Sequence, residues 1–256
     1  MPDQLAHFLF AGRVYEKLSP ALKARIDASS AAFRAGTFGP DPLFNDTNAR
    51  RRAEGFQMHR LSCAALMERM RPAIRRGMPG AEDYAAGFFC HYALDRICHP
   101  ELIARHNAGH ERHVAMETAY DRHLYLRGAR NLPRRIILSP SECRAACEMY
   151  KTQTPESFRR NVNAYWRLRR MLLAAGGTPL SEAAGRIKPE WKGIIPSKNP
   201  SEGIKSAISM LDERLESSVD IAAAQLEKLF CAFDSGKPFD PWLSYNFKGE
   251  PAGNID

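Results

Sequence analysis

Gly87-Phe-Phe-Cys-His91-Tyr-Ala-Leu-Asp95-Arg-Ile-Cys-His99-Pro100 is the most informative stretch of this sequence. Its polar residues His91, Asp95 and His99 follow one another at intervals of four, which places their side chains on one face of an α-helix. The residues around them are mainly apolar, so we expect this helix to be buried. An aspartate buried between two histidines is costly without a compensating partner, and a divalent cation is the usual one. The stretch therefore predicts a metal-binding helix.

A second pair of metal-ligand type follows in His113-Val-Ala-Met-Glu117. A histidine and a carboxylate one helical turn apart can bind one metal ion from the same side. A single pair of this kind also arises by chance on helix surfaces. Here, however, such pairs stand on two consecutive predicted helices, and helical bundles commonly build metal sites between facing helices. The two helices together predict a metal site with His and carboxylate ligands.

The rest of the chain carries apolar residues at helical spacing nearly everywhere, and the only strand-like run is Arg135-Ile136-Ile137-Leu138. A first helix is predicted to end at 19–20, and another is predicted to start near 139–141. Further helices are predicted over 22–33, 57–76, 81–99, 109–126, 155–175 and 200–232. Pro100 is expected to end the helix over 81–99, because proline removes a helical hydrogen bond. The predicted fold class is all-α, a single-domain multi-helix bundle.

This single α-helical domain is expected to span residues 1–256. Residues 1–125 form its metal-site half, because they contain all the candidate ligands. Residues 126–256 are expected to form C-terminal helices, with long irregular segments at 176–200 and 233–256.

Composition narrows the range of partners and locations. The formal charge of +8 favours anionic partners such as phosphate esters, nucleic acid or a membrane surface, or else a solvated basic surface without a specific partner. No apolar stretch reaches the ~18 residues of a transmembrane helix, and the N-terminus does not resemble a signal peptide, so a cytoplasmic location is expected. The 6 cysteines form no CxxC pair, which favours reduced, mostly buried thiols.

These features together resemble the zinc-dependent phospholipase C family, which is related to the fungal single-strand zinc nucleases. The resemblance covers roughly residues 1–125 and rests on the order and the types of the residues. They are an early helical His7, the loop Gly39-Pro40-Asp41-Pro42, His59 on the next helix, the block of residues 87–100, and His113-x3-Glu117-x3-Asp121.

The resemblance implies how the ligands are divided between zinc ions. Asp41, His59, His91 and Asp95 would surround one zinc ion, and His99, His113 and Glu117 would hold a second. His7 and Asp95 would contribute to a third. The secreted members have an N-terminal Trp that helps to bind this third ion, and the present sequence has no such residue, so two zinc ions are expected and a third is left open.

The resemblance also implies the reaction, a metal-dependent phosphodiester hydrolysis in which a metal-bound hydroxide attacks phosphorus of an anionic phosphoester substrate. Neighbouring zinc ions lower the pKa of a water between them and clamp the oxygens of the phosphodiester. Asp41, on its proline-flanked loop, is expected to act both as a ligand and as the catalytic residue that orients the attacking water.

Two other functions fit the same residues. One is a single-strand nuclease or nucleotidase that uses the same zinc cluster, with nucleic acid as a partner. Basic residues around Tyr165-Trp166 resemble a stacking patch for single strands, although an amphipathic helix with its aromatic side in the core fits them better. The other is a non-catalytic zinc-binding helical protein. The sequence leaves open the natural substrate, the oligomeric state and the role of residues 176–256.

Other polar residues near the predicted ligands are expected to stay off the metal. His106, His110 and His123 are assigned to the surface or to positions behind the ligands, and Asp121 is expected to orient a ligand histidine. Cys90, Cys98, Cys143 and Cys147 are expected to pack as buried thiols.

Overall fold

The computed structural model describes residues 4–109, 112–128, 135–179, 183 and 194–252. Its elements are α1 (Gln4–Glu16), α2 (Pro20–Lys23), α3 (Ala31–Gly36), η1 (Asp41–Asn45), α4 (Ala49–Met58), α5 (Cys63–Arg75), α6 (Ala81–Asn107), α7 (His113–Leu126), α8 (Pro140–Cys147), α9 (Pro155–Ala175), α11 (Glu202–Ser235) and η3 (Pro241–Ser244). Within these ranges no residue belongs to a β-strand and β-type pairing is limited to isolated bridges, such as that between Tyr245 and Pro251, so the all-α fold is confirmed. None of the described helices combines the length and the apolar character that a membrane span requires.

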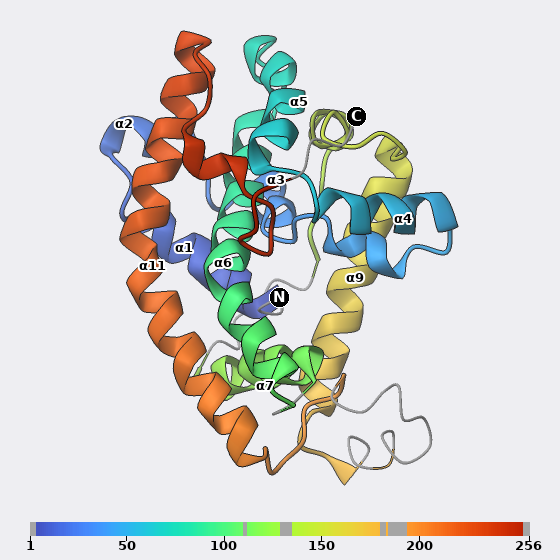
Figure 1. Ribbon diagram of the computed structural model, residues 1–256. Coiled ribbons are helices and arrows are strands. Elements are labelled where there is room, and N and C mark those ends of the chain that lie inside the picture. The colour runs from blue at the N-terminus through green and yellow to red at the C-terminus, as the bar shows by residue number, and fades with distance from the viewer. Residues whose placement is uncertain (1–3, 110–111, 129–134, 180–182, 184–193, 253–256) are drawn as a thin grey trace.

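Helix α6 is the central element of the fold (Figure 1). It contacts α1, α3, α5, α7, α8 and α11, and every residue from Tyr84 to Asp95 is buried. In Figure 1, α9 and α11 lie on opposite sides of α6, and α7 crosses near one end of it. The burial of α6 explains why its polar residues stand in an otherwise apolar stretch, and it carries His91 and Asp95 into the interior of the protein.

Helix α3 approaches α6 most closely, at two glycines. A Cβ atom on Gly87 would collide with the carbonyl oxygen of Phe33, and one on Gly36 would collide with the carbonyl oxygen of Tyr84. Backbone therefore packs directly against backbone at this crossing. The turn that follows α3 is consequently laid onto α6 beside His91.

Two of the predicted helices are divided, and both predictions were wrong. The helix predicted over 22–33 is broken because Ser30 starts α3 as its N-cap, accepting a hydrogen bond from an amide of α3 at 3.0 Å. The helix predicted over 57–76 is broken because Ser62 caps α5 in the same way at 3.2 Å. Such hydroxyls offer the backbone an alternative to continuing the helix. The second break leaves His59 as the residue that ends α4.

Pro100 does not end α6, which continues to Asn107, so this prediction was also wrong. A proline inside a helix costs about 3 kcal/mol. The turns beyond it bury Leu102 completely and bring Glu101 against α11, where Arg214 donates to it at 3.1 Å. These tertiary contacts offset the cost of the proline.

The remaining predictions concern the second half of the chain. The helices predicted near 139–141 and over 155–175 and 200–232 correspond to α8, α9 and α11, and the one predicted over 109–126 begins at His113. The segment 135–138 belongs to no strand. Most of 176–200 lies outside the described residues, and 233–256 contains the end of α11 and η3.

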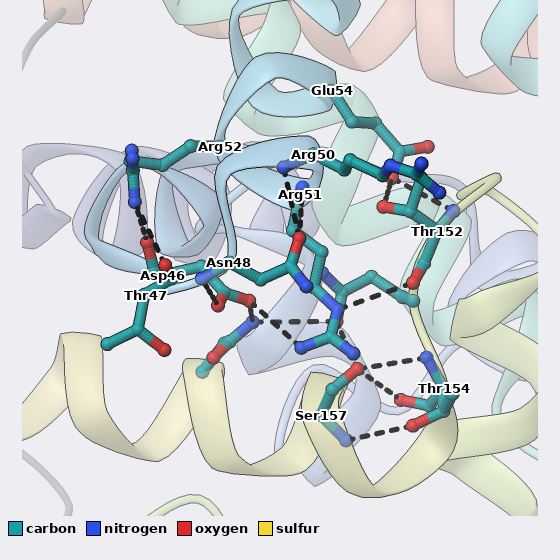
Figure 2. A network of polar contacts seen from close by, with 12 residues as sticks. Asp46, Thr47, Asn48, Arg50, Arg51, Arg52, Glu54, Thr152, Thr154 and Ser157 are labelled. Atoms are coloured by element: carbon teal, nitrogen blue, oxygen red, sulfur yellow. Dashed lines mark hydrogen bonds and ion pairs between the residues drawn. The ribbon is translucent and has the colours of Figure 1, made fainter.

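A buried carboxylate network joins α4 to α9 and to the loop before it (Figure 2). Glu54 on α4 accepts hydrogen bonds from the amide and the hydroxyl of Thr152. Asp46, just before α4, accepts a hydrogen bond from the side-chain amide of Asn161 on α9 at 2.6 Å. Asp46 and Asn161 are both buried. The network therefore fixes α4, and His59 at its end, relative to α9.

The chain after α11 returns to the middle of α6. Trp242 and Phe247 pack on Tyr92 with ring centroids 5.4 Å and 5.3 Å away, and Phe247 also contacts Phe88 at 6.0 Å. Phe247 is completely buried. A segment without any sequence motif therefore forms one wall around the central stretch of α6.

Candidate metal centre

Side chains of metal-ligand type gather on α6 and on the elements around it. The structure brings them into three groups, within each of which the candidate ligand atoms lie within 4.8 Å of one another. The groups are His7, His91 and Asp95; Asp41, His59 and His91; and His99, His113 and Glu117. Each of the eight residues predicted as ligands belongs to at least one group, and His91 belongs to two.

The group of Asp41, His59 and His91 joins α6 to η1 and to the end of α4. Asp41 opens η1, and its Oδ1 atom lies 3.2 Å from Nε2 of His59 and 3.9 Å from Nε2 of His91. The loop that carries Asp41 rests on the His91 ring at Gly39, where a Cβ atom would lie 2.6 Å from the ring Cγ atom. Gly39 also has a positive φ of 53°, which favours glycine. The chain therefore needs glycine here to bring Asp41 to α6.

Asp95 lies between two imidazole rings. Its Oδ1 atom is 3.2 Å from Nε2 of His7, and its Oδ2 atom is 3.3 Å from Nε2 of His91. The rings of His7 and His91 are stacked with centroids 4.0 Å apart. Asp95 is completely buried, so the two oxygens of one carboxylate serve two neighbouring histidines in the interior.

The third group joins α6 to α7. His113 begins α7, and its Nε2 atom lies 2.6 Å from Oε1 of Glu117, one turn later. The ring of His99 on α6 stacks on that of His113 with centroids 5.3 Å apart. Burial lowers the pKa of His99 to about 3 and that of His113 to about 2. Both imidazoles are therefore neutral near neutral pH, which is the form that binds a metal ion.

Three of the histidines are oriented by backbone carbonyl groups. The Nδ1 atom of His59 lies 2.8 Å from the Gly55 oxygen, that of His91 lies 3.2 Å from the Thr37 oxygen, and that of His99 lies 2.6 Å from the Phe247 oxygen. A carbonyl oxygen only accepts hydrogen bonds, so Nδ1 carries the proton in each ring. The neutral ring then keeps its lone pair on Nε2, the nitrogen that faces the carboxylates of Asp41 and Asp95 in His59 and His91.

Several of these facing atoms have no hydrogen bond among the described residues. They are Nε2 of His7 and His91, Oδ1 of Asp41, and both carboxylate oxygens of Asp95, and all of them are buried. A lone pair that faces a carboxylate oxygen across about 3 Å is repelled unless a proton or a metal cation lies between the two atoms. The arrangement therefore fits zinc, which accepts mixed shells of histidine nitrogens and carboxylate oxygens.

Without a metal ion, the charges of the site must be balanced by protons. Burial would lower the pKa of His91, but the carboxylates of Asp95 and Asp41 outweigh burial and raise this pKa. Burial would raise the pKa of Asp95, but the surrounding imidazoles of His91, His99 and His7 hold it well below its usual range. The carboxylates therefore remain ionised and attract cations to the site.

Asp121 supports the site through the backbone of α1. Its Oδ2 atom accepts a hydrogen bond from the amide of Leu5 at 2.7 Å, and its Oδ1 atom accepts one from the amide of Ala6 at 2.9 Å. These amides lie in the first turn of α1, where backbone donors lack helical partners. Asp121 thus caps the helix that carries His7.

The other histidines lie outside the three groups. Nε2 of His123 lies 3.1 Å from Oδ2 of Asp212, and His106 is exposed. His110 lies outside the described residues. Cys90 and Cys98 are completely buried, and burial raises the pKa of both thiols, which agrees with packing in place of ligation.

Two residues of the site have no signal in the sequence. The hydroxyl of Tyr165 donates a hydrogen bond to Oδ2 of Asp41 at 3.2 Å, and the two residues are 124 positions apart. Phe247 supplies the carbonyl group that orients His99, from a segment without a motif. Tyr165 and Trp166 are each only 1% exposed and pack on Phe38, so the aromatic side of α9 is core and offers no stacking surface to nucleic acid.

Comparison with known proteins agrees with this geometry. The chain matches the family model described as zinc dependent phospholipase C over residues 6–176. This range includes η1, α4, α6 and α7, and it extends through α9, beyond the part of the sequence that carries the ligand motifs. No curated protein and no solved structure matches the chain. Because the family model covers more than half of the sequence, the chain belongs to the zinc dependent phospholipase C family.

Proposed function

We propose that the chain is a zinc-dependent phosphodiester hydrolase of the phospholipase C type and that the three ligand groups form its active site. The observation that carries this proposal is the orientation of His59 and His91. Carbonyl groups hold Nδ1 of both rings, so that Nε2 faces the buried carboxylates of Asp41 and Asp95. This arrangement is costly for an apo protein and suits one that binds divalent cations.

The ligand groups suggest a minimum of two zinc ions. Asp41, His59, His91 and Asp95 would hold one, and His99, His113 and Glu117 would hold the other. His7 and the second oxygen of Asp95 offer donors for a third. When bound, zinc supplies a Lewis acid that activates water and neutralises charge on the phosphodiester.

Asp41 is the residue that we assign to the chemistry. Its Oδ1 atom faces the imidazoles of His59 and His91, and its Oδ2 atom is fixed by the hydroxyl of Tyr165. A carboxylate held in this way can orient the attacking water and accept its proton. His113 has a side chain that is 26% exposed, more than any other histidine of the three groups, and we place the entrance for the substrate beside it.

A phospholipid is the substrate that we favour, on the ground of family membership. The nuclease alternative has no specific structural support, because the aromatic residues of α9 are buried. A cytoplasmic location stays a prediction from the sequence.

The proposal is tested by measuring metal content and hydrolysis in the same samples. We expect elemental analysis to find at least two zinc ions per chain, and chelation to abolish headgroup release from phosphatidylcholine. His91→Ala should lose zinc and activity together, whereas His123→Ala, a histidine paired with Asp212 outside the groups, should retain both. Fewer than two zinc ions per chain, or full activity in His91→Ala, would contradict the mechanism.

A further inference from the structure

A strip of arginines and apolar side chains lies on the outer side of α9, away from the three ligand groups. The segment before α8 runs beside α9, where the side-chain amide of Asn163 donates a hydrogen bond to the carbonyl oxygen of Ile136 at 3.1 Å. Exposure alternates along this segment, because Ile136 is buried whereas Arg135 and Ile137 face solvent. A groove opens between the segment and α9, and Arg159 and Arg167 line its other side.

Two apolar side chains stand among these cations. Ile137 is 81% exposed, and Met171, one helical turn beyond Arg167, is 68% exposed. Scattered apolar residues are normal on protein surfaces, but these are two of the most exposed large apolar side chains of the described residues. Ile137 lines the groove, and Met171 lies one helical turn beyond Arg167, which also lines it. We call Arg135, Ile137, Arg159, Arg167 and Met171 the docking strip.

The arginines of the docking strip are not neutralised by the protein. Among the residues that the structure describes, no carboxylate forms an ion pair with Arg135, Arg159 or Arg167. By contrast, Arg51 on α4 pairs with Asp46. The docking strip therefore keeps its positive charge available to an anionic partner.

We propose that the docking strip binds the surface of a bilayer that contains anionic phospholipid. Apolar side chains flanked by cations suit the boundary between headgroups and acyl chains. There the apolar side chains are buried and the cations contact lipid phosphates. Single-stranded nucleic acid fits less well, because it would need exposed aromatic rings, and Tyr165 and Trp166 of the same helix face the core. No residue of the docking strip belongs to a ligand group, so membrane binding and hydrolysis can be tested separately.

The test is co-sedimentation of the zinc-loaded chain with vesicles, read before measurable headgroup release. We expect binding to vesicles of phosphatidylglycerol mixed with phosphatidylcholine, and much weaker binding to phosphatidylcholine alone. Arg159→Gln combined with Arg167→Gln should weaken binding about twenty-five-fold, because each arginine contributes about fivefold. Ile137→Ser combined with Met171→Ser should weaken it about tenfold or more. All four positions are exposed, so these variants should fold.

Matched controls lie on other faces of the protein. Arg75→Gln combined with Lys237→Gln removes the same charge from exposed positions at the ends of α5 and α11. Ile221→Ser removes an apolar side chain that is 51% exposed on α11, on the opposite side of α6 from α9 (Figure 1). Both controls should bind vesicles as the parent chain does.

Hydrolysis of a water-soluble phosphodiester separates this proposal from the proposed function. We expect the docking-strip variants to hydrolyse it at the parent rate while vesicle binding falls. Equal binding to neutral and anionic vesicles, or equal losses in the controls and the docking-strip variants, would overturn the proposal. The proposal would also fail if the parent chain bound a single-stranded oligonucleotide and the docking-strip variants lost that binding while they still bound vesicles. A parent chain that binds anionic vesicles but hydrolyses nothing would refute only the proposed function.

Discussion

The hydroxyl of Tyr165 donates a hydrogen bond to Oδ2 of Asp41 across 3.2 Å, which links α9 to the loop that delivers Asp41 to the ligand groups. Both side chains are buried, so water does not compete for this contact. The bond leaves Oδ1 of Asp41 directed at His59. Tyr165 is therefore a positioning residue for the carboxylate to which we assign the chemistry.

Tyr165→Phe should separate this positioning from packing. The ring remains in the core, so we expect the free energy of unfolding to fall by only about 1 kcal/mol. Because Asp41 would lose the group that fixes its orientation, kcat should fall about tenfold with little change in KM. Steady-state kinetics with a soluble phosphodiester provides the measurement.

The control for this variant is Tyr120→Phe. The hydroxyl of Tyr120 also donates to an aspartate, Asp212, at 3.1 Å, but the pair lies outside the ligand groups. This variant should lose similar stability and keep its kcat. An equal fall of kcat in both variants would assign the effect of Tyr165 to general stability.

Asp121 provides a second prediction, because it caps the helix that carries His7. Asp121→Ala leaves two buried amides of α1 without their acceptor and should lower the free energy of unfolding by about 2 kcal/mol. The displaced His7 should also weaken metal binding at Asp95. Asp121→Asn keeps one acceptor oxygen, so its free energy of unfolding should lie between those of the parent and the alanine variant. Chemical denaturation and elemental analysis test this order, and an alanine variant as stable as the parent would contradict it.

The sequence was enough to predict which residues gather in the three groups, but not the surroundings that orient them. The spacing of four on α6 and α7 follows from helix geometry alone, so the positions of Asp95 and Glu117 relative to their histidines could be anticipated. The roles of Tyr165 and Phe247 could not, since they depend on contacts between distant segments that leave no local pattern.

The errors in the helix boundaries have the same origin. Pro100 was expected to end α6 on local grounds, but contacts between α6 and α11 outweigh its cost. Conversely, the hydroxyls of Ser30 and Ser62 start new helices within runs of helical apolar spacing. Local propensity is thus decisive only where tertiary contacts do not oppose it.

The buried histidines predict how the metal-free protein responds to acid. Burial lowers the pKa of His99 to about 3 and that of His113 to about 2, whereas both are near 6.5 in an unfolded chain. Below about pH 6.5 the unfolded chain therefore binds more protons, and each of these histidines should reduce stability by up to about 1.4 kcal/mol per pH unit. The stability that the protein has above about pH 6.5 is therefore lost progressively as the pH falls below this value.

Urea unfolding of the chelated protein between about pH 7 and pH 5 measures this dependence. His113→Gln removes one of these two groups, the partly exposed one, and should make the decline with pH shallower. A slope that is identical in the parent chain and His113→Gln would show that His113 is not held neutral by the fold.

Gly39 offers the sharpest test of how the fold assembles the site, because a matched glycine exists elsewhere. Gly39 and Gly77 have similar positive φ values of 53° and 61°, but a Cβ atom on Gly39 would strike the His91 ring whereas one on Gly77 would meet nothing within 4 Å. Gly77→Ala should therefore cost only the backbone strain, about 1–2 kcal/mol. Gly39→Ala adds the collision and should cost about 2–5 kcal/mol. The collision also moves His91 or the Asp41 loop, so we expect Gly39→Ala to lose zinc and activity while Gly77→Ala retains both. Equal stability and equal zinc content in the two variants would mean that the loop can yield without disturbing His91, and that its contact with α6 does not place Asp41.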